Sequence, residues 1–420
     1  MNKKRALLII IIFALIVLLA LIIFYFFFKR ESTPYQPTTP PGEVTFPIGP
    51  DLTGGPGGES GATSTAPYQY EYYNRPQTFQ NERAKLRLIS SLPVSGATLF
   101  KQNADVFIHY VERANGHIYE TIASRDETPY RISKTTIPKI YQAYWVQQGQ
   151  GVIIRYLKDD VVQTFYARIR PSASTSTEQD LVNGTFLPSG ISELAVSPSG
   201  ERIFYLVRSV GETLGIRSNP DGTQRTQIFS STVNGWLPVW SGNNVLMLIT
   251  KPSAGVPGYA YTVNASSGSM KKILGGISGL TLLPDNNATS LLYSESKTGG
   301  LSIKSLDTRK GIVSEVGITT LPEKCVWGIK RTTIVFCAVP DHISGDAYPD
   351  AWYQGVVSFT DNIWKINLET GEATIVLSPQ SVAQKTMDIT DLVLDESESY
   401  LLFTNKKDLS LWLLDLRENL

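Results

Sequence analysis

Cysteine and histidine are scarce in this sequence: its 420 residues include two Cys and three His. A clustered Cys/His metal site needs about four such ligands at short spacing, so the composition excludes one. Charged residues make up 18% of the chain, and 38 Lys and Arg balance 38 Asp and Glu. Without a net positive charge, the chain has no global field with which to attract nucleic acid.

The motifs of several enzyme classes are also missing. The sequence has no G-x-S-x-G elbow, no H-E-x-x-H pair and no phosphate-binding glycine loop. His109 and His117 flank Ala114-Asn115-Gly116, which reads as an ordinary hairpin turn. Enzymes with paired carboxylates stay open, because their acids come from distant parts of a chain. No cofactor is expected.

The longest apolar run covers residues 6–28 and follows Lys3, Lys4 and Arg5. As a helix it would span roughly 35 Å, enough to cross a bilayer. A cleaved signal peptide is the alternative, but its apolar core is about 7–15 residues long and ends at small residues. We therefore expect a transmembrane helix over 6–28. The positive charges before it predict a cytoplasmic tail over 1–5 and an extracytoplasmic remainder, making a single-pass membrane protein.

Residues 29–84 are rich in proline, glycine, serine and threonine. Such a segment buries too little apolar surface to offset its ordering entropy, so it predicts a disordered linker. As a flexible coil it would hold the following domain about 40 Å from the membrane.

Short apolar segments of similar sequence recur from residue 85 onward. They stand at 87–90, 130–133, 227–229, 272–274 and 374–377. All but the first close blocks of roughly forty to sixty residues, a period typical of β-propellers. The composition, rich in Tyr and β-branched residues, also favours strands over helices.

Within one block, four apolar runs alternate with turns. The runs are 194–196, 203–207, 213–217 and 226–229. Several blocks place a glycine before the last run, as Gly222, Gly268, Gly311 and Gly371, where a hairpin loop needs positive φ. Aligned on the last strand, the blocks are 91–133, 134–187, 188–229, 230–274, 275–316, 317–377 and 378–420.

The last block contains three strands before the chain ends, whereas residues 86–90 match a fourth strand and have no block of their own. We therefore predict an all-β, seven-bladed propeller over 85–420, with its last blade completed by strand 86–90. Six or eight blades are the alternatives if the longer blocks are divided differently. Pairing the two chain ends would close the ring and remove two open strand edges.

The segment Val196-Ser197-Pro198-Ser199-Gly200-Glu201-Arg202-Ile203 resembles the turn of TolB-like and WD40-like bacterial propeller repeats, with Ser199 in place of the usual Asp. Residues 394–400 are a weaker copy, and 367–372 resemble the turn before the last strand of such repeats. The order of anchor, linker and propeller is similar to membrane-anchored envelope proteins of bacteria. The resemblance implies scaffolding or binding and brings no catalytic residues.

Cys325 and Cys337 flank an apparent hairpin and are equally distant from its turn near Arg331. They could therefore face each other across two strands, at a spacing near the lower end of disulfide geometry. A disulfide would suit an extracytoplasmic compartment. Two buried thiols are the alternative.

An insertion over 340–353 interrupts the sixth block and is the candidate partner-binding loop. Its candidate residues are Asp341, His342, Asp346, Asp350, Trp352 and Tyr353. The three acids could ligate Ca²⁺, but their spacing matches no EF-hand loop, and we expect no metal. Loops on a rigid scaffold often carry recognition residues, and exposed aromatic side chains suit protein contacts. Simple packing of the loop over the ring is the alternative.

Together these features predict a membrane-anchored extracytoplasmic propeller that acts as a protein-interaction scaffold or adaptor for unidentified envelope proteins. The alternative is a carbohydrate- or peptide-processing propeller enzyme. Acids clustered at the mouth of the central channel would favour the enzyme, and an apolar, aromatic-rimmed face would favour the scaffold.

Overall fold

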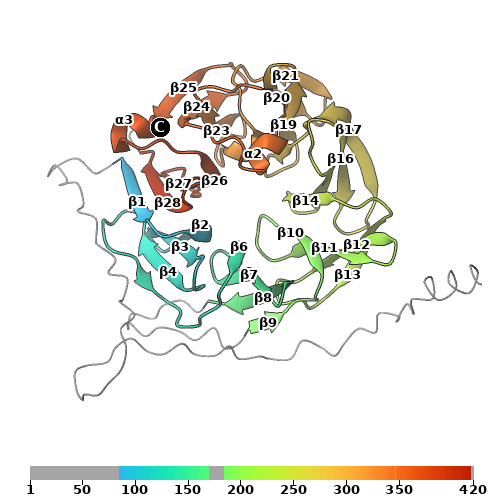
Figure 1. Ribbon diagram of the computed structural model, residues 1–420, viewed down its shortest axis with the longest axis horizontal. Coiled ribbons are helices and arrows are strands. Elements are labelled where there is room, and N and C mark those ends of the chain that lie inside the picture. The colour runs from blue at the N-terminus through green and yellow to red at the C-terminus, as the bar shows by residue number, and fades with distance from the viewer. Residues whose placement is uncertain (1–84, 170–183, 346, 418–420) are drawn as a thin grey trace, which may run out of the picture. The chain divides into compact units, whose positions relative to one another are not determined.

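The computed structural model describes residues 85–169, 184–345 and 347–417. The expected tail, transmembrane helix and linker over residues 1–84 lie outside these ranges. Within the described ranges, no helix has the length and apolar character needed to cross a membrane. Seven four-stranded antiparallel sheets form a ring (Figure 1). The predicted seven-bladed propeller is therefore confirmed, and the six- and eight-bladed alternatives are wrong.

The first strand of each blade lies nearest the ring centre and the fourth lies at the rim (Figure 1). Blade 1 consists of β2 (Val94–Gln102), β3 (Asp105–Glu112), β4 (Ile118–Ile122) and β5 (Tyr130–Arg131). Blade 2 consists of β6 (Ile140–Val146), β7 (Gly151–Lys158), β8 (Val161–Arg168) and β9 (Gly184–Phe186). Blade 3 consists of β10 (Ile191–Val196), β11 (Ile203–Ser209), β12 (Glu212–Ser218) and β13 (Thr226–Ser231).

The next three blades repeat this plan. Blade 4 consists of β14 (Trp236–Ser241), β15 (Val245–Thr250), β16 (Pro257–Asn264) and β17 (Met270–Ser278). Blade 5 consists of β18 (Leu282–Pro284), β19 (Ser290–Lys297), β20 (Gly300–Asp307) and β21 (Ile312–Glu315). Blade 6 consists of β22 (Cys325–Trp327), β23 (Ile334–Pro340), β24 (Asp361–Asn367) and β25 (Ala373–Leu377). Among the described residues, three short helices accompany the blades: η1 (Pro322–Lys324), α2 (Asp350–Tyr353) and α3 (Pro379–Ala383).

Blade 7 joins the two ends of the described chain. Its order is β26 (Ile389–Leu394), β27 (Tyr400–Asn405), β28 (Ser410–Asp415) and then β1 (Leu86–Ser90). Strand β1 pairs antiparallel with β28, placing Leu86 opposite Leu414 and Leu88 opposite Trp412. The predicted closure by residues 86–90 is thus confirmed.

Turn chemistry explains why the third and fourth strands pair where they do. In blade 4, the Asn264 side-chain oxygen accepts hydrogen bonds from the amides of Ser266 and Ser267. The chain then returns through Gly268 at φ 74°, whose N–H bonds the Asn264 carbonyl at 2.8 Å. A Cβ on this glycine would lie 2.3 Å from the Ile228 carbonyl oxygen of blade 3. Glycine is therefore required both by the turn and by the close approach of two blades.

The hydrophobic core is divided among the interfaces between blades. Seven buried clusters each combine side chains from two neighbouring blades. The closing strand contributes to two of them, with Leu86 facing blade 6 and Ile89 facing blade 1. An eighth cluster belongs to the insertion in blade 6.

Successive strands in a blade run in opposite directions, so the connections between strands lie on two opposite faces of the ring. The upper face carries the connections between second and third strands and those between blades. The connections between second and third strands are 113–117, 159–160, 210–211, 251–256, 298–299, 341–360 and 406–409. The lower face carries the connections between first and second strands. These are 103–104, 147–150, 197–202, 242–244, 285–289, 328–333 and 395–399. Strand β1 runs from the lower to the upper face, so the chain enters the propeller at the lower face.

Candidate functional site

The insertion of blade 6 spans 341–360 on the upper face and contains α2. Trp352 on this helix is 4% exposed and packs in a cluster with Tyr348 and Phe359. Its ring centroid lies 6.3 Å from that of Phe359. Trp352 therefore secures the loop from inside, which corrects the expectation that it offers an exposed aromatic contact.

A buried carboxylate fixes the position of this tryptophan. Trp352 Nε1 lies 3.2 and 3.0 Å from the two oxygens of Asp388. The same carboxylate accepts hydrogen bonds from the Phe359 amide at 3.1 Å and the Ser358 hydroxyl at 3.2 Å. Asp388 thus ties three points of the insertion to the start of blade 7.

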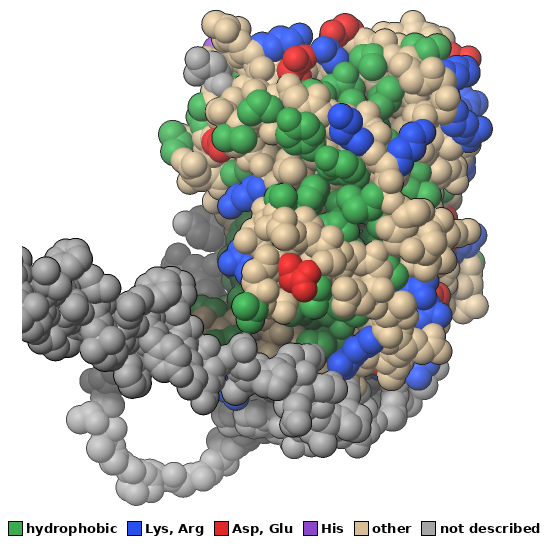
Figure 2. All heavy atoms as spheres, turned by 90° about the vertical axis from the view of Figure 1, so that its right-hand side faces the viewer, with side chains coloured by type: hydrophobic (Ala, Val, Ile, Leu, Met, Phe, Trp, Pro, Cys, Tyr) green, Lys and Arg blue, Asp and Glu red, His purple; other side chains and the backbone are tan. Residues whose placement is uncertain are grey.

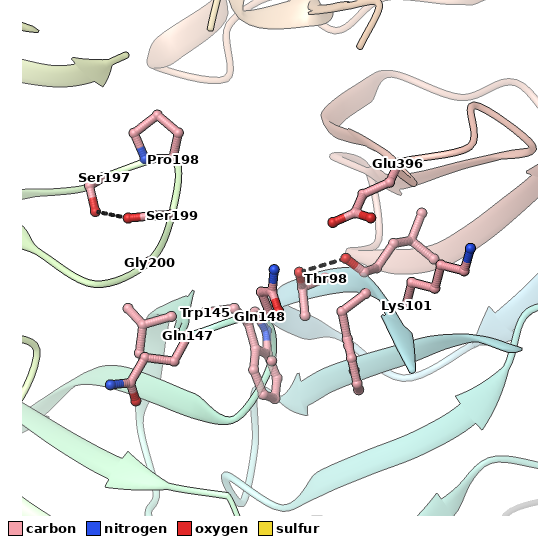
Figure 3. A pocket seen from close by; sticks show the side chains of 14 residues that line it. Thr98, Lys101, Trp145, Gln147, Gln148, Ser197, Pro198, Ser199, Gly200 and Glu396 are labelled. Atoms are coloured by element: carbon pink, nitrogen blue, oxygen red, sulfur yellow. Dashed lines mark hydrogen bonds between the residues drawn. The ribbon is translucent and has the colours of Figure 1, made fainter. Parts of the chain in front are cut away.

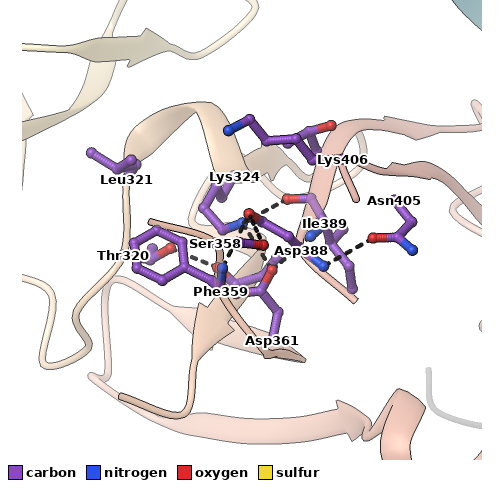
Figure 4. A network of polar contacts seen from close by, with 12 residues as sticks. Thr320, Leu321, Lys324, Ser358, Phe359, Asp361, Asp388, Ile389, Asn405 and Lys406 are labelled. Atoms are coloured by element: carbon purple, nitrogen blue, oxygen red, sulfur yellow. Dashed lines mark hydrogen bonds and ion pairs between the residues drawn. The ribbon is translucent and has the colours of Figure 1, made fainter. Parts of the chain in front are cut away.

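Lys324 lies at the centre of this polar network (Figure 4). Its Nζ is 2.6 Å from Asp388 Oδ1, 2.8 Å from Asp361 Oδ2 and 2.9 Å from the Ile389 carbonyl oxygen. All three ammonium hydrogens therefore have acceptors. With Lys324 fully buried, these charges form an internal clamp that a solvent-borne substrate does not reach.

The two carboxylates of the clamp differ in acidity. Burial raises the pKa of Asp361 to about 6, although the Lys324 ammonium opposes this shift. Burial also acts to raise the pKa of Asp388, but Lys324 and the donors from Phe359 and Trp352 lower it below its usual value. Of the two carboxylates, Asp361 is therefore the one that takes up a proton first as the pH falls.

The remaining candidate residues of the insertion lie nearer the surface. Asp341 and His342 are exposed, and Tyr353 is 43% exposed. Asp350 Oδ2 accepts the Ala254 amide at 2.6 Å, which links the insertion to blade 4. Asp346 lies outside the described residues. Among the described residues, no three His, Cys, Asp or Glu side chains come together as metal ligands.

Tyr353 also reaches toward the ring. Its hydroxyl donates to Glu323, whose second oxygen accepts the Thr281 hydroxyl at 2.8 Å. Burial raises the pKa of both Tyr353 and Glu323, and their proximity adds to the shift of the tyrosine. The insertion is thus pinned to blades 4, 5, 6 and 7 by separate contacts.

The two cysteines lie in the same blade. Cys325 of β22 is directly opposite Cys337 of β23, with Cα atoms 4.0 Å apart and the sulfurs joined as a disulfide. Both side chains are buried at the interface between blades 5 and 6. The bond therefore lies in the core, away from both faces.

A second site is a cavity of about 210 Å³ on the lower face, between blades 7, 1, 2 and 3 (Figure 3). Blade 1 contributes Phe100 and Lys101, and blade 2 contributes Trp145 and Gln148. The turn at 197–200 of blade 3 closes one side, and Glu396 of blade 7 lies on the other (Figure 3). Among the described residues that line it, Glu396 is the one carboxylate, and none is His or Cys.

The blade 2 turn beside this cavity has an unusual backbone. Gln147 and Gln148 both have φ 51°, in the left-handed region, which costs about 1–2 kcal/mol for each non-glycine residue. Neighbouring groups hold the turn: the Tyr166 hydroxyl donates to Gln147 Oε1 at 2.9 Å. Gly200 packs so closely that a Cβ there would lie 2.2 Å from the Gln147 nitrogen. The turn is therefore fixed from two sides.

His109 supports the same turn from blade 1. Its Nδ1 lies 3.1 Å from the Gly149 carbonyl oxygen, so this nitrogen must carry a hydrogen. Its Nε2 lies 2.5 Å from Glu120 Oε2, and both side chains are buried. This histidine is thus a structural support behind the cavity.

Exposed apolar side chains gather on the upper face. At loop tips, Val210 is 87%, Val356 is 75% and Val256 is 63% exposed. Further exposed apolar residues at this end of the blades are Leu92, Leu157, Val161, Val233, Tyr353 and Val382. At the lower end of the described blades, the comparable residues are Ile329 in a turn and Tyr130, Met270 and Ile312 at the starts of fourth strands.

Apolar side chains are also exposed at the rim, on the fourth strands. They are Leu88, Tyr130, Met270, Ile312, Val313 and Ile375. Figure 2 shows one side of the ring, where hydrophobic side chains form a band beside Lys and Arg. The rim residues lie along strands rather than at projecting tips, so they provide a comparison set for the upper face.

No protein-family model and no curated protein sequence matches this chain. Solved structures similar to it include TolB from Acinetobacter baumannii, at 13% identity over 64% of this chain and with a TM-score of 0.42. The chain spans 62% of that protein's length. An oligogalacturonate lyase from Vibrio parahaemolyticus has 9% identity, coverage of 79% and 92%, and a TM-score of 0.48.

The β-propeller domain of the Trilobed protease from Pyrococcus furiosus has 10% identity, coverage of 77% and 95%, and a TM-score of 0.48. These similarities assign neither an activity nor a partner to this chain. The assignment of the propeller fold is based on the seven sheets of this chain itself.

Proposed function

We propose that this chain is a non-catalytic scaffold, held at the outer side of a membrane by residues 6–28, that docks envelope proteins on the upper face of its propeller. The observation that carries this proposal is the gathering of exposed aliphatic loop tips on that face, led by Val210, Val256 and Val356. Exposed apolar side chains concentrated on one face of a domain are typical of an interaction site.

Charge on the same face supports a particular kind of partner. Exposed cations stand beside the apolar tips: Lys158 next to Leu157, Arg208 two residues before Val210, and Lys251 at the start of the Val256 loop. A partner with an apolar centre and an acidic rim would complement this pattern.

Two features weigh against the enzyme alternative. The lower-face cavity has one carboxylate among its described lining residues, whereas glycoside hydrolysis by paired acids needs two. The two carboxylates that do lie together, Asp361 and Asp388, are buried around Lys324. Binding is therefore the function that the site supports best.

The docking proposal is tested by crosslinking the full chain in intact membranes and identifying bound proteins. A variant carrying Val210→Asp, Val256→Asp and Val356→Asp should lose the crosslinked partner, since an unpaired charge is costly in an apolar interface. The matched control carries Met270→Asp, Ile312→Asp and Ile375→Asp on the rim and should keep it. Loss in both variants, or in neither, would contradict docking on the upper face.

The topology has its own test. With tags at both ends, added protease should remove the C-terminal tag from intact cells lacking an outer barrier and spare the N-terminal tag. A protected C-terminal tag would exclude the extracytoplasmic location.

A further inference from the structure

We propose that the lower-face cavity is a saccharide-binding site that accepts one or two neutral sugar residues. This site is independent of the upper-face docking surface, because the two lie on opposite faces of the ring. Its volume of about 210 Å³ is below the range of roughly 300–1,000 Å³ that holds drug-sized ligands. The cavity therefore suits a ligand of one or two rings.

An ordered aromatic wall forms one side of the cavity. Trp145 Nε1 donates to the Gly96 carbonyl oxygen at 3.3 Å, which turns the polar edge of the indole toward the protein. Its centroid lies 5.2 Å from the His109 ring, which in turn lies 4.5 Å from Phe100. The apolar ring surface is thus held in place before a ligand arrives, so little ordering is needed on binding.

Polar groups of several kinds surround this wall. The exposed Gln148 amide offers both donors and an acceptor to the cavity. Thr98 and Ser199 add hydroxyls, which bond the Leu99 carbonyl and the Ser197 hydroxyl, and Lys101 and Glu396 lie on the same side of the cavity (Figure 3). Since one ammonium and one carboxylate cancel, the cavity favours a neutral ligand over a strongly charged one.

A sugar residue matches both parts of this arrangement. One side of a pyranose ring presents C–H groups that pack on an indole, and its edge carries hydroxyls that both donate and accept. A peptide side chain of the same size is either apolar or has one polar head, so it would form fewer hydrogen bonds with these groups than a sugar. The turn that carries Gln148 is held by Gly200 and by the His109 bond to Gly149, so the backbone from which this side chain extends is fixed.

The test uses the full chain in a detergent without a sugar headgroup. Saturation-transfer NMR is recorded with N-acetylglucosamine, methyl β-glucoside, cellobiose and, as the competing class, the tripeptide Gly-Phe-Gly. At least one sugar should give a saturable signal with Kd near millimolar, as expected for so small a ligand. Gln148→Ala should weaken that binding about tenfold, and Trp145→Phe should weaken it by reducing the stacking surface.

The matched control is Gln384→Ala. Gln384 is also an exposed glutamine with φ 51°, but it ends α3 on the upper face, so its replacement should leave sugar binding unchanged. Melting curves of all variants establish that they are folded. The proposal is overturned if no sugar gives a saturable signal at 50 mM, or if Gln384→Ala and Gln148→Ala act equally. Binding of the tripeptide without any sugar would also overturn it.

Discussion

Replacing Lys324 by methionine removes the cation of the buried clamp while nearly preserving side-chain length. Two carboxylates, Asp361 and Asp388, would then face each other without the ammonium that lies 2.8 and 2.6 Å from them. Breaking a buried ion pair by removing one partner costs about 3–5 kcal/mol, because the remaining charge stays desolvated. At about 2.1 cal/mol/K of unfolding entropy per residue, a domain of this size should melt roughly 4–7 °C lower.

The insertion should respond more strongly than the rest of the ring. Lys324 also lies 5.1 Å from the Trp352 ring centroid and 5.3 Å from that of Phe359, so the substitution removes cation–π contacts from the cluster that secures the loop. Hydrogen exchange followed by mass spectrometry should therefore show faster exchange over 341–360, with blades 1 to 3 unchanged.

Lys304→Met is the matched control. Lys304 lies 2.7 Å from Glu295, but both side chains are partly exposed on the outer part of blade 5. Such a pair contributes about 0–1 kcal/mol, so this variant should melt within about 1–2 °C of the wild type.

The pH dependence separates a charge effect from a packing effect. In the Lys324→Met variant, the orphaned carboxylates regain neutrality by taking up protons, so its deficit should shrink between pH 7.5 and pH 5. A melting temperature within 1 °C of the wild type at pH 7.5 would refute the clamp. A deficit that stays constant down to pH 5 would show that lost packing, rather than unpaired charge, causes it.

Three further predictions concern other parts of the structure. The raised pKa of Asp361, about 6 against a usual 3.8, means that the folded state binds its proton first as the pH falls. Wild type should therefore gain about 1 kcal/mol relative to Asp361→Asn between pH 7 and pH 5 in thermal melts; no relative gain would contradict the raised pKa. Deleting residues 85–90 removes β1 and exposes β28, so the melting temperature should fall by several degrees, and an unchanged melt would contradict the closure. Mass spectrometry without reductant should find Cys325 linked to Cys337, and two free thiols would exclude the bond.

Blade number and closure could be predicted from the sequence because they depend on local signals. The third-to-fourth strand turns of blades 3 to 6 each contain a glycine, Gly222, Gly268, Gly311 and Gly371, with φ between 69° and 79°. These turns set the block boundaries, and counting strands then left 86–90 as the missing member of the last blade. The alternation of apolar and polar residues along a strand, and the residue types that favour turns, both depend on near neighbours in the sequence. They can therefore be recognised without knowledge of the fold.

The clamp could not be predicted in this way. Lys324, Asp361 and Asp388 stand 27 or more residues apart and belong to a short helix, a third strand and the approach to blade 7. Nothing in the sequence distinguishes this lysine from exposed ones, since burial is decided by how the blades meet. The cavity could not be predicted for the same reason, because its lining residues come from the turns and inner strands of four blades.

Trp352 is a residue for which the sequence and the structure each supply part of the explanation. An aromatic residue in a long loop predicts a contact, and it makes one, but with Asp388 of its own chain rather than with a partner. The consequence for function lies in the loop itself, because an insertion pinned by Trp352, Asp350 and Tyr353 loses little conformational entropy when something binds to it. Val356, four residues beyond the buried tryptophan, is thereby presented as a fixed apolar tip. The clamp and the docking face are therefore coupled: Lys324→Met should weaken partner crosslinking through the insertion, whereas Lys304→Met should not.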